Sequence, residues 1–183
     1  LIFNFSKFPH SNYQKVSPWK LVSVVFSHKK FWIFGIAIFL GGGVESAFTF
    51  WSRSFVEFFL DDLPRTGAFA IVLFSAGMIF GRLISSKLSE LIGLKHLMLL
   101  SAFFGLIVTV FVPFTNSLTK FYSLIFVAGL STACFWPTIL AAAKENIKVD
   151  TTILMILLAV LGISGFGIIP WIMGIIGDLF DLR

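Results

Sequence analysis

The chain has 183 residues, of which 57% are hydrophobic and only 13% are charged, and its mean hydropathy is +0.96. A water-soluble domain carries about 25% charged residues, so this chain has too few polar side chains to cover a solvated surface. Its net charge of +5 does not indicate nucleic acid binding, because Lys and Arg are spread between apolar runs rather than clustered on one face. We therefore expect an integral membrane protein.

The sequence does not indicate metal, disulfide or cofactor chemistry. The single cysteine, Cys134, lies inside an apolar run, and the three histidines are far apart in the sequence. Neither a disulfide framework nor a thiolate metal site can be built from these residues. No second acid, histidine pair or serine with an adjacent base lies at one membrane depth, so an enzyme is not expected.

Five stretches are long and apolar enough to cross a bilayer, which takes about 20 residues each. Their runs are apolar on every face, whereas barrel strands alternate apolar and polar residues. We expect an all-α, multi-pass transmembrane helical bundle over residues 31–183, preceded by a cytoplasmic linker over 1–30. The predicted spans are 31–60, 66–86, 96–114, 121–143 and 151–176.

The distribution of positive charge predicts the orientation of these spans. Ten of the Lys and Arg residues fall on the side that includes residues 1–30, the second-to-third connection and the fourth-to-fifth connection. Residues 1–30 are therefore predicted to be cytoplasmic, in a multi-pass protein of the cell membrane. The chain starts without methionine and stops directly after an apolar run, so we expect it to be a piece of a larger protein.

Glu45 is the clearest candidate for a functional residue. It lies about 21 Å of helix rise into the first span, and charged groups at such depth usually face a bundle interior or a wet cavity. Gly41, Gly42 and Gly43 precede it and are expected to weaken the helix, while Thr49 shares its polar face. Glu45 either lines a cavity, where it contacts solute or carries a coupling proton, or is a buried glutamate that bonds a neighbouring helix.

Near the outer end of the first span, Arg53 and Glu57 are four residues apart on one helix. That spacing places their side chains side by side, and the predicted ion pair contributes only a few tenths of a kcal/mol.

The fourth and fifth spans contain residues that bend or tighten helices. Pro137 removes a backbone donor and should loosen its helix one turn earlier, which would allow Trp136 to face a cavity or simply to pack. Pro170, Gly174 and Asp178 share a face of the fifth span, where bending or close packing is expected. The two spans expected to be interrupted, the first and the fifth, are where a transporter's site is sought.

Three stretches resemble the C-terminal half of a major facilitator superfamily transporter. Residues 81–95 are similar to that family's cytoplasmic loop motif, with Glu90 at the acid, Gly93 at the glycine and Lys95 at the last base, preceded by Arg82. Residues 135–138 and 170–178 resemble the tenth and eleventh helices. On this resemblance the five spans are helices seven to eleven.

The resemblance implies secondary active transport of a small solute by alternating access, in which two six-helix halves rock about a central site. The partners implied are the lipid bilayer, the solute and an N-terminal six-helix half that these 183 residues do not include. Arg82 and Glu90 would be loop residues that hold one facing state, or ordinary cytoplasmic anchors. The other interpretation is a non-transporting membrane protein, such as a sensor, an assembly partner or a remnant.

Overall fold

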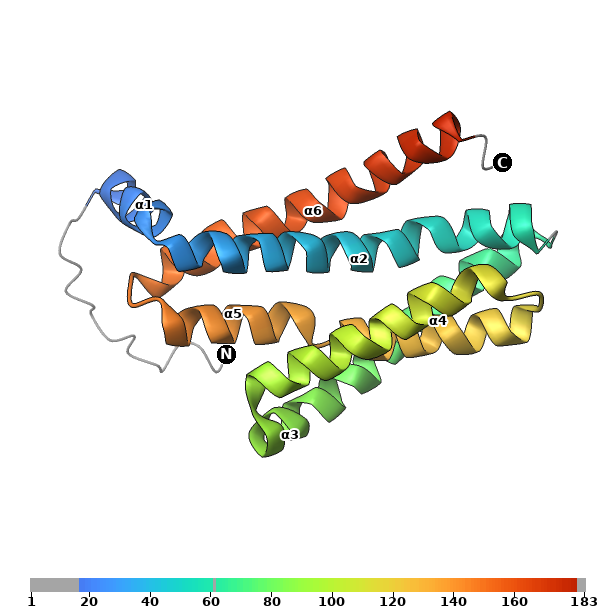
Figure 1. Cartoon of the computed structure of the whole chain (residues 1–183), viewed down its shortest axis with the longest axis horizontal. Helices are drawn as coiled ribbons and strands as arrows, with labels where there is room; N and C mark the ends of the chain where they lie inside the picture. The colour runs from blue at the N-terminus through green and yellow to red at the C-terminus, as the bar shows by residue number, and fades with distance from the viewer. Residues whose placement is uncertain (1–16, 61, 181–183) are drawn as a thin grey trace, which may run out of the picture.

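A computed structural model describes residues 17–60 and 62–180, and in these residues the chain forms a bundle of long helices (Figure 1). In chain order the helices are α1 (Pro18–Ser27), α2 (Lys29–Phe59), α3 (Pro64–Phe111), the short 3-10 turn η2 (Val112–Phe114), α4 (Leu118–Thr132), α5 (Phe135–Asn146) and α6 (Thr151–Leu179). The prediction of an all-α bundle is confirmed. Most of the predicted linker lies in residues 1–16, outside the described residues.

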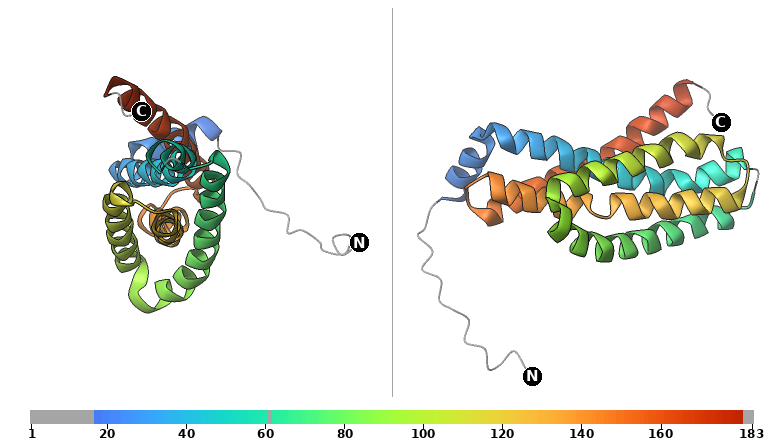
Figure 2. Two further views of the ribbon diagram at one scale, coloured as in Figure 1. Left: turned by 90° about the vertical axis from the view of Figure 1, so that its right-hand side faces the viewer. Right: turned by 60° about the horizontal axis from the view of Figure 1, so that its bottom comes forward.

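Four helical stretches are long and apolar enough to cross a membrane: Lys29–Phe59, Arg65–Phe114, Leu118–Asn146 and Thr151–Leu179. The second is 50 residues long, or about 75 Å of helix rise, which is far longer than one bilayer crossing. It is a hairpin, because Gly93 has φ 77° and ψ 160° and interrupts the helix. Residues 64–92 (the first arm) and 94–111 (the second arm) run in opposite directions (Figure 2), as the second and third predicted spans require.

Gly93 forms this turn through its backbone conformation rather than through tight packing. A positive φ is readily adopted by glycine and is disfavoured for residues with a side chain. A Cβ atom at Gly93 would meet nothing within 4 Å, so no neighbouring atom requires a glycine there. The sequence prediction treated residues 81–95 as a loop with Arg82 and Glu90 in it. That prediction was wrong, because the first arm stays helical through both residues and reverses only at Gly93.

The fourth predicted span is broken at Ala133 and Cys134, where α4 ends and α5 begins. Pro137 lacks the N–H that would otherwise bond the carbonyl of Ala133, so the break lies one turn before the proline. The first and fifth spans, by contrast, are not interrupted. α2 is continuous through its three glycines, and α6 is continuous through Pro170.

Glycines bring the helix backbones together at two crossings. Where α2 crosses α6, side chains added at Gly42 or Gly165 would collide with the carbonyl groups of Gly162 and Phe39. Where the first arm of α3 crosses α4, Gly77 and Gly129 make the same kind of contact with backbone carbonyls. Small residues are needed at such crossings because helix association in lipid relies on close packing rather than on the hydrophobic effect.

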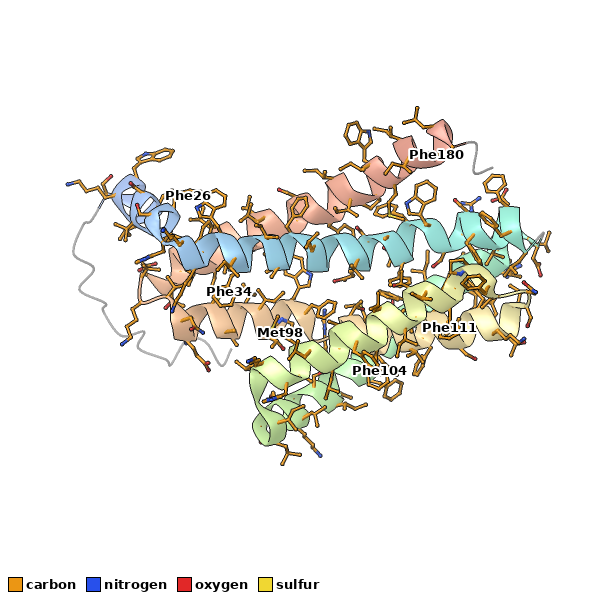
Figure 3. All side chains as sticks on the ribbon, in the orientation of Figure 1. Phe26, Phe34, Met98, Phe104, Phe111 and Phe180 are labelled. Atoms are coloured by element: carbon orange, nitrogen blue, oxygen red, sulfur yellow. The ribbon has the colours of Figure 1, made fainter. Side chains whose placement is uncertain are left out.

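Two buried clusters hold the bundle, one at each end. The first joins α2, α5 and α6 around Ile38, Ile139 and Leu158, and the second joins α2, α3 and α4 around Phe74 and Phe121. Outside these clusters the helices expose large apolar side chains. Figure 3 labels Phe104 and Phe111 on the second arm of α3, where they are 50% and 56% exposed. Apolar surface of this extent suits contact with lipid.

Two glycines in α6 provide a matched test of the α2–α6 crossing. A methyl group at Gly165 would collide with the backbone of Phe39, whereas one at Gly167 would meet nothing within 4 Å. We expect Gly165→Ala to destabilise the protein by about 1–3 kcal/mol through overpacking. Gly167→Ala should be neutral or stabilise by up to about 1 kcal/mol through helix propensity. Thermal unfolding of each purified variant in detergent measures the two changes in stability. Equal changes for Gly165→Ala and Gly167→Ala would show that the crossing is looser than described.

Candidate functional site

Glu45 lies halfway along α2. Sixteen residues separate it from Lys29 and fourteen from Phe59, which correspond to about 24 Å and 21 Å of helix rise. Its side chain is neither fully buried nor fully exposed. The three glycines that precede it, Gly41–Gly43, are buried against α5 and α6, with Gly41 near Phe135 and Gly43 against Ile169. These glycines seat α2 deep in the bundle and so hold Glu45 at its centre.

Arg82 lies inside the first arm of α3, eleven residues before the reversal at Gly93, or about 16 Å along the helix. It is exposed among the described residues. An arginine at this depth must face a partner, a wet cavity or the membrane surface by snorkelling. Sequence reasoning missed this location because it assigned Arg82 to a connecting loop.

Trp136 lies at a comparable depth, ten residues before the end of α5 at Asn146, or about 15 Å. Its indole lies over Gly162 of α6, where an added Cβ would come within 2.5 Å of the ring. The indole Nε1 is buried and has no hydrogen-bond partner in the structure. An unpaired buried donor costs about 1–3 kcal/mol, so this N–H favours a nearby acceptor such as the Glu45 carboxyl.

These three residues converge although they come from three different helices. Arg82 acts on the Glu45 carboxyl through its charge, and the Trp136 indole approaches the same carboxyl. Arg82 and Glu45 do not form an ion pair; among the described residues the ion pair is Arg53–Glu57, at 4.0 Å on the exposed part of α2. The predicted Arg53–Glu57 pair is thus confirmed. The mid-membrane group contains one acid, one cation and one indole donor.

The Thr49 hydroxyl makes its hydrogen bonds within α2. It donates to the carbonyls of Ser46 and Glu45, at 3.0 Å and 3.2 Å, which leaves only its oxygen lone pairs for another group. The hydroxyl of Ser46 likewise donates to Gly43, at 2.9 Å. The polar face predicted around Glu45 therefore offers a solute fewer donors than its composition indicates.

The other predicted site residues lie at the ends of the bundle. Gly93 and Lys95 line a pocket beside the end of α5, and Glu90 is exposed on the first arm. Gly174 and Asp178 line a pocket of about 630 Å³ between the diverging ends of α2 and α6, together with Trp51. Trp51 also lines an apolar cavity of about 380 Å³, and its Nε1 is buried without a partner.

Glu45 is not among the residues that line these pockets. The charge of Arg82 and the indole of Trp136 thus act on Glu45 without an Arg82–Glu45 ion pair. Within residues 17–60 and 62–180, no cluster of three or more His, Cys, Asp or Glu is placed to hold a metal ion.

The arrangement of long apolar helices defines a multi-pass membrane protein. No protein family model matches the chain, and no solved structure matches it. It is a distant homologue of the membrane protein MosC of Rhizobium meliloti, with 29% identity over 157 residues. These residues are 84% of this chain but 38% of the relative, so the chain spans well under half of that protein.

Proposed function

We propose that this chain is part of a secondary transporter that moves a small solute across the membrane by alternating access, with Glu45 carrying a coupling proton. The observation that carries the proposal is the convergence of Glu45, Arg82 and an unpaired Trp136 N–H halfway across the bundle. Ionisable groups at that depth are costly and usually mark a solute or proton pathway. A carboxyl, a guanidinium and an indole donor can together hold a polar solute and exchange a proton with it.

The break between α4 and α5 supports the same site. Trp136 is the second residue of α5, directly after this break, and its indole packs against Gly162 of α6. Discontinuous helices near the bilayer midplane are a common feature of transporter sites. A loosened segment also gives Trp136 room to move when the site opens and closes.

The length of the relative supports a longer protein with further membrane spans. MosC extends beyond the matched residues by about 250 residues, enough for about seven further spans at the spacing seen here. We propose that the five crossings are helices seven to eleven of a major facilitator superfamily protein, and that a six-helix N-terminal half completes the site. In this proposal the solute is carried without chemical change.

The basic residues support an orientation for the bundle. Lys29, Lys95 and Lys144 lie at the end of the bundle where α2 starts, α3 reverses and α5 ends; we call this the basic end. Positive residues accumulate on the cytoplasmic side of membrane proteins. We propose that the basic end faces the cytoplasm across the cell membrane.

Uptake by the purified protein in liposomes tests this proposal. An inward proton gradient should drive accumulation of at least one solute from a panel of neutral, cationic and anionic small molecules, and an uncoupler should abolish it. Empty liposomes and protein inactivated by heat are the controls. If well-folded protein shows no uptake and no exchange of any solute, the chain belongs to a non-transporting membrane protein.

A further inference from the structure

Two neighbouring hollows meet at the basic end of the bundle, and they differ in chemistry. One is a pocket of about 650 Å³ between the α3 hairpin and the end of α5, whose polar lining residues include Ser89, Lys95, His96, Glu145 and Asn146. The other is an apolar groove of about 600 Å³ lined by Ile92, His96, Leu99, Leu100 and Phe103. His96 and Leu99 line both, so the polar pocket and the apolar groove are continuous.

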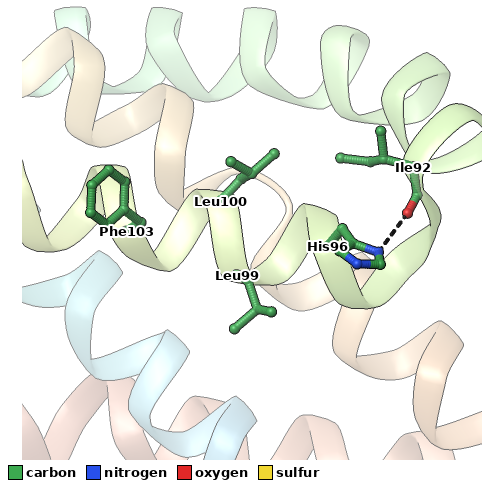
Figure 4. A pocket seen from close by; sticks show the side chains of 5 residues that line it. All are labelled: Ile92, His96, Leu99, Leu100 and Phe103. Atoms are coloured by element: carbon green, nitrogen blue, oxygen red, sulfur yellow. Dashed lines mark hydrogen bonds between the residues drawn. The ribbon is translucent and has the colours of Figure 1, made fainter.

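Figure 4 shows the groove along the second arm of α3. The ring of His96 is tied to the helix, since its Nδ1 donates to the carbonyl of Ile92 at 3.0 Å. With Nδ1–H as the donor of a neutral imidazole, the other ring nitrogen, Nε2, can accept a hydrogen bond from a group in the pocket. Beyond it on the same arm, Leu99, Leu100 and Phe103 are 59%, 44% and 58% exposed.

The polar pocket contains one cation and one anion that are not paired with each other. Lys95 and Glu145 both line it, and they form no ion pair in the structure. Ser89 and Asn146 add a hydroxyl and an amide. The side chains of Ser89 and Asn146 each donate to a carbonyl of their own helix, at 2.8 Å and 2.9 Å. Lys95 and Glu145 therefore provide the unpaired charges for a ligand.

We propose that this composite site binds one zwitterionic phospholipid with a primary ammonium headgroup, phosphatidylethanolamine. Lys95 holds the phosphate, Glu145 accepts hydrogen bonds from the ammonium group, and one acyl chain lies in the groove along Leu99 and Phe103. The proposal uses only the hairpin and the end of α5, so it does not depend on transport.

The charge pattern distinguishes this ligand from other lipids. An anionic headgroup such as phosphatidylglycerol would use Lys95 but would be repelled by Glu145. A choline headgroup carries the same charges but has no N–H to donate to Glu145. A charge-assisted hydrogen bond of this kind contributes about 1.5–3 kcal/mol, which corresponds to an affinity difference of about tenfold or more.

Native mass spectrometry of the detergent-purified protein, with each lipid added separately, tests the site. The wild-type protein should retain one phosphatidylethanolamine at least about tenfold more strongly than phosphatidylcholine or phosphatidylglycerol. Glu145→Gln should remove the preference over phosphatidylcholine while leaving a bound phospholipid. Lys95→Gln should weaken retention of all three lipids.

Lys144→Gln is the matched control, because Lys144 is exposed on the last turn of α5 next to Glu145 but does not line the pocket. It should leave the preference unchanged. A preference for phosphatidylglycerol in the wild-type protein, equal retention of all three lipids, or a Glu145→Gln variant that behaves as wild type would each overturn the proposal. Circular dichroism of each variant shows that any loss of lipid does not come from unfolding.

Discussion

Replacing Glu45 with glutamine should abolish proton-driven accumulation of solute, while leaving exchange of solute across the membrane largely intact. Glutamine keeps the size and hydrogen-bonding capacity of the side chain but cannot release a proton. If Glu45 carries the coupling proton, the variant should lose its response to an imposed pH gradient by about 100-fold or more, in the range of a lost essential proton carrier. Its exchange rate should then vary little with pH between 5 and 8.

Uptake and exchange in liposomes measure these two properties separately. Glu57→Gln is a suitable control, since Glu57 is on the same helix but lies near the C-terminal end of α2, in an exposed pair with Arg53. A Glu45→Gln variant with wild-type accumulation and a wild-type pH profile would remove Glu45 from proton coupling. Glu45 would then be a structural residue that holds α2 against its neighbours.

Removing Arg82 should destabilise the protein mainly because it leaves Glu45 without a nearby positive charge inside the membrane. We expect Arg82→Gln and Glu45→Gln each to cost stability, and the double variant to cost less than their sum. Groups that interact show coupling energies of about 0.5–3 kcal/mol, and we expect the lower part of that range here because Arg82 and Glu45 form no ion pair.

This coupling is measured by denaturant or thermal unfolding in detergent. The proteins compared are the wild type, the two single variants and the double variant. The exposed pair Arg53–Glu57 supplies an internal comparison, because an exposed pair should couple by no more than about 0.5 kcal/mol. Additive effects at Arg82 and Glu45 would show that the two residues act independently, and the central group of three would lose its physical basis.

The helical spans could be predicted well from the sequence because hydropathy alone determines which segments cross a bilayer. The connections between the spans were harder to predict. Residues 85–90 contain three serines, a lysine and a glutamate, a composition that is typical of a loop, yet they continue the first arm of α3. Only Gly93 breaks the helix, and a single positive φ is not visible in a composition pattern.

This error in the connection also hid a site residue. Because the first arm extends to Ile92, Arg82 lies within a helix rather than in a loop, where its charge acts on Glu45. The sequence identified Glu45 and Trp136 one at a time, from an acid in an apolar run and an aromatic next to a proline. Their convergence with Arg82 depends on how three helices cross, and no local pattern contains that information.

The glycines had a different role from the one expected. Gly41–Gly43 were expected to weaken the first span, yet α2 is continuous and these residues allow its contact with α5 and α6. Propensity measures the cost of a glycine in an isolated helix, whereas here close packing of backbones compensates for it. The break occurs instead before Pro137, where a missing donor removes a specific hydrogen bond.

The most direct test of the central claim is whether water reaches position 45 from each side of the membrane in turn. The measurement is labelling of Glu45→Cys with a membrane-impermeant thiol reagent, applied from one side or the other, in a Cys134→Ser background. Cys134 is the one cysteine among these 183 residues and is buried. An alternating site predicts labelling from both sides, with a transported solute protecting the thiol. A thiol that reacts from neither side would contradict a solute pathway through Glu45.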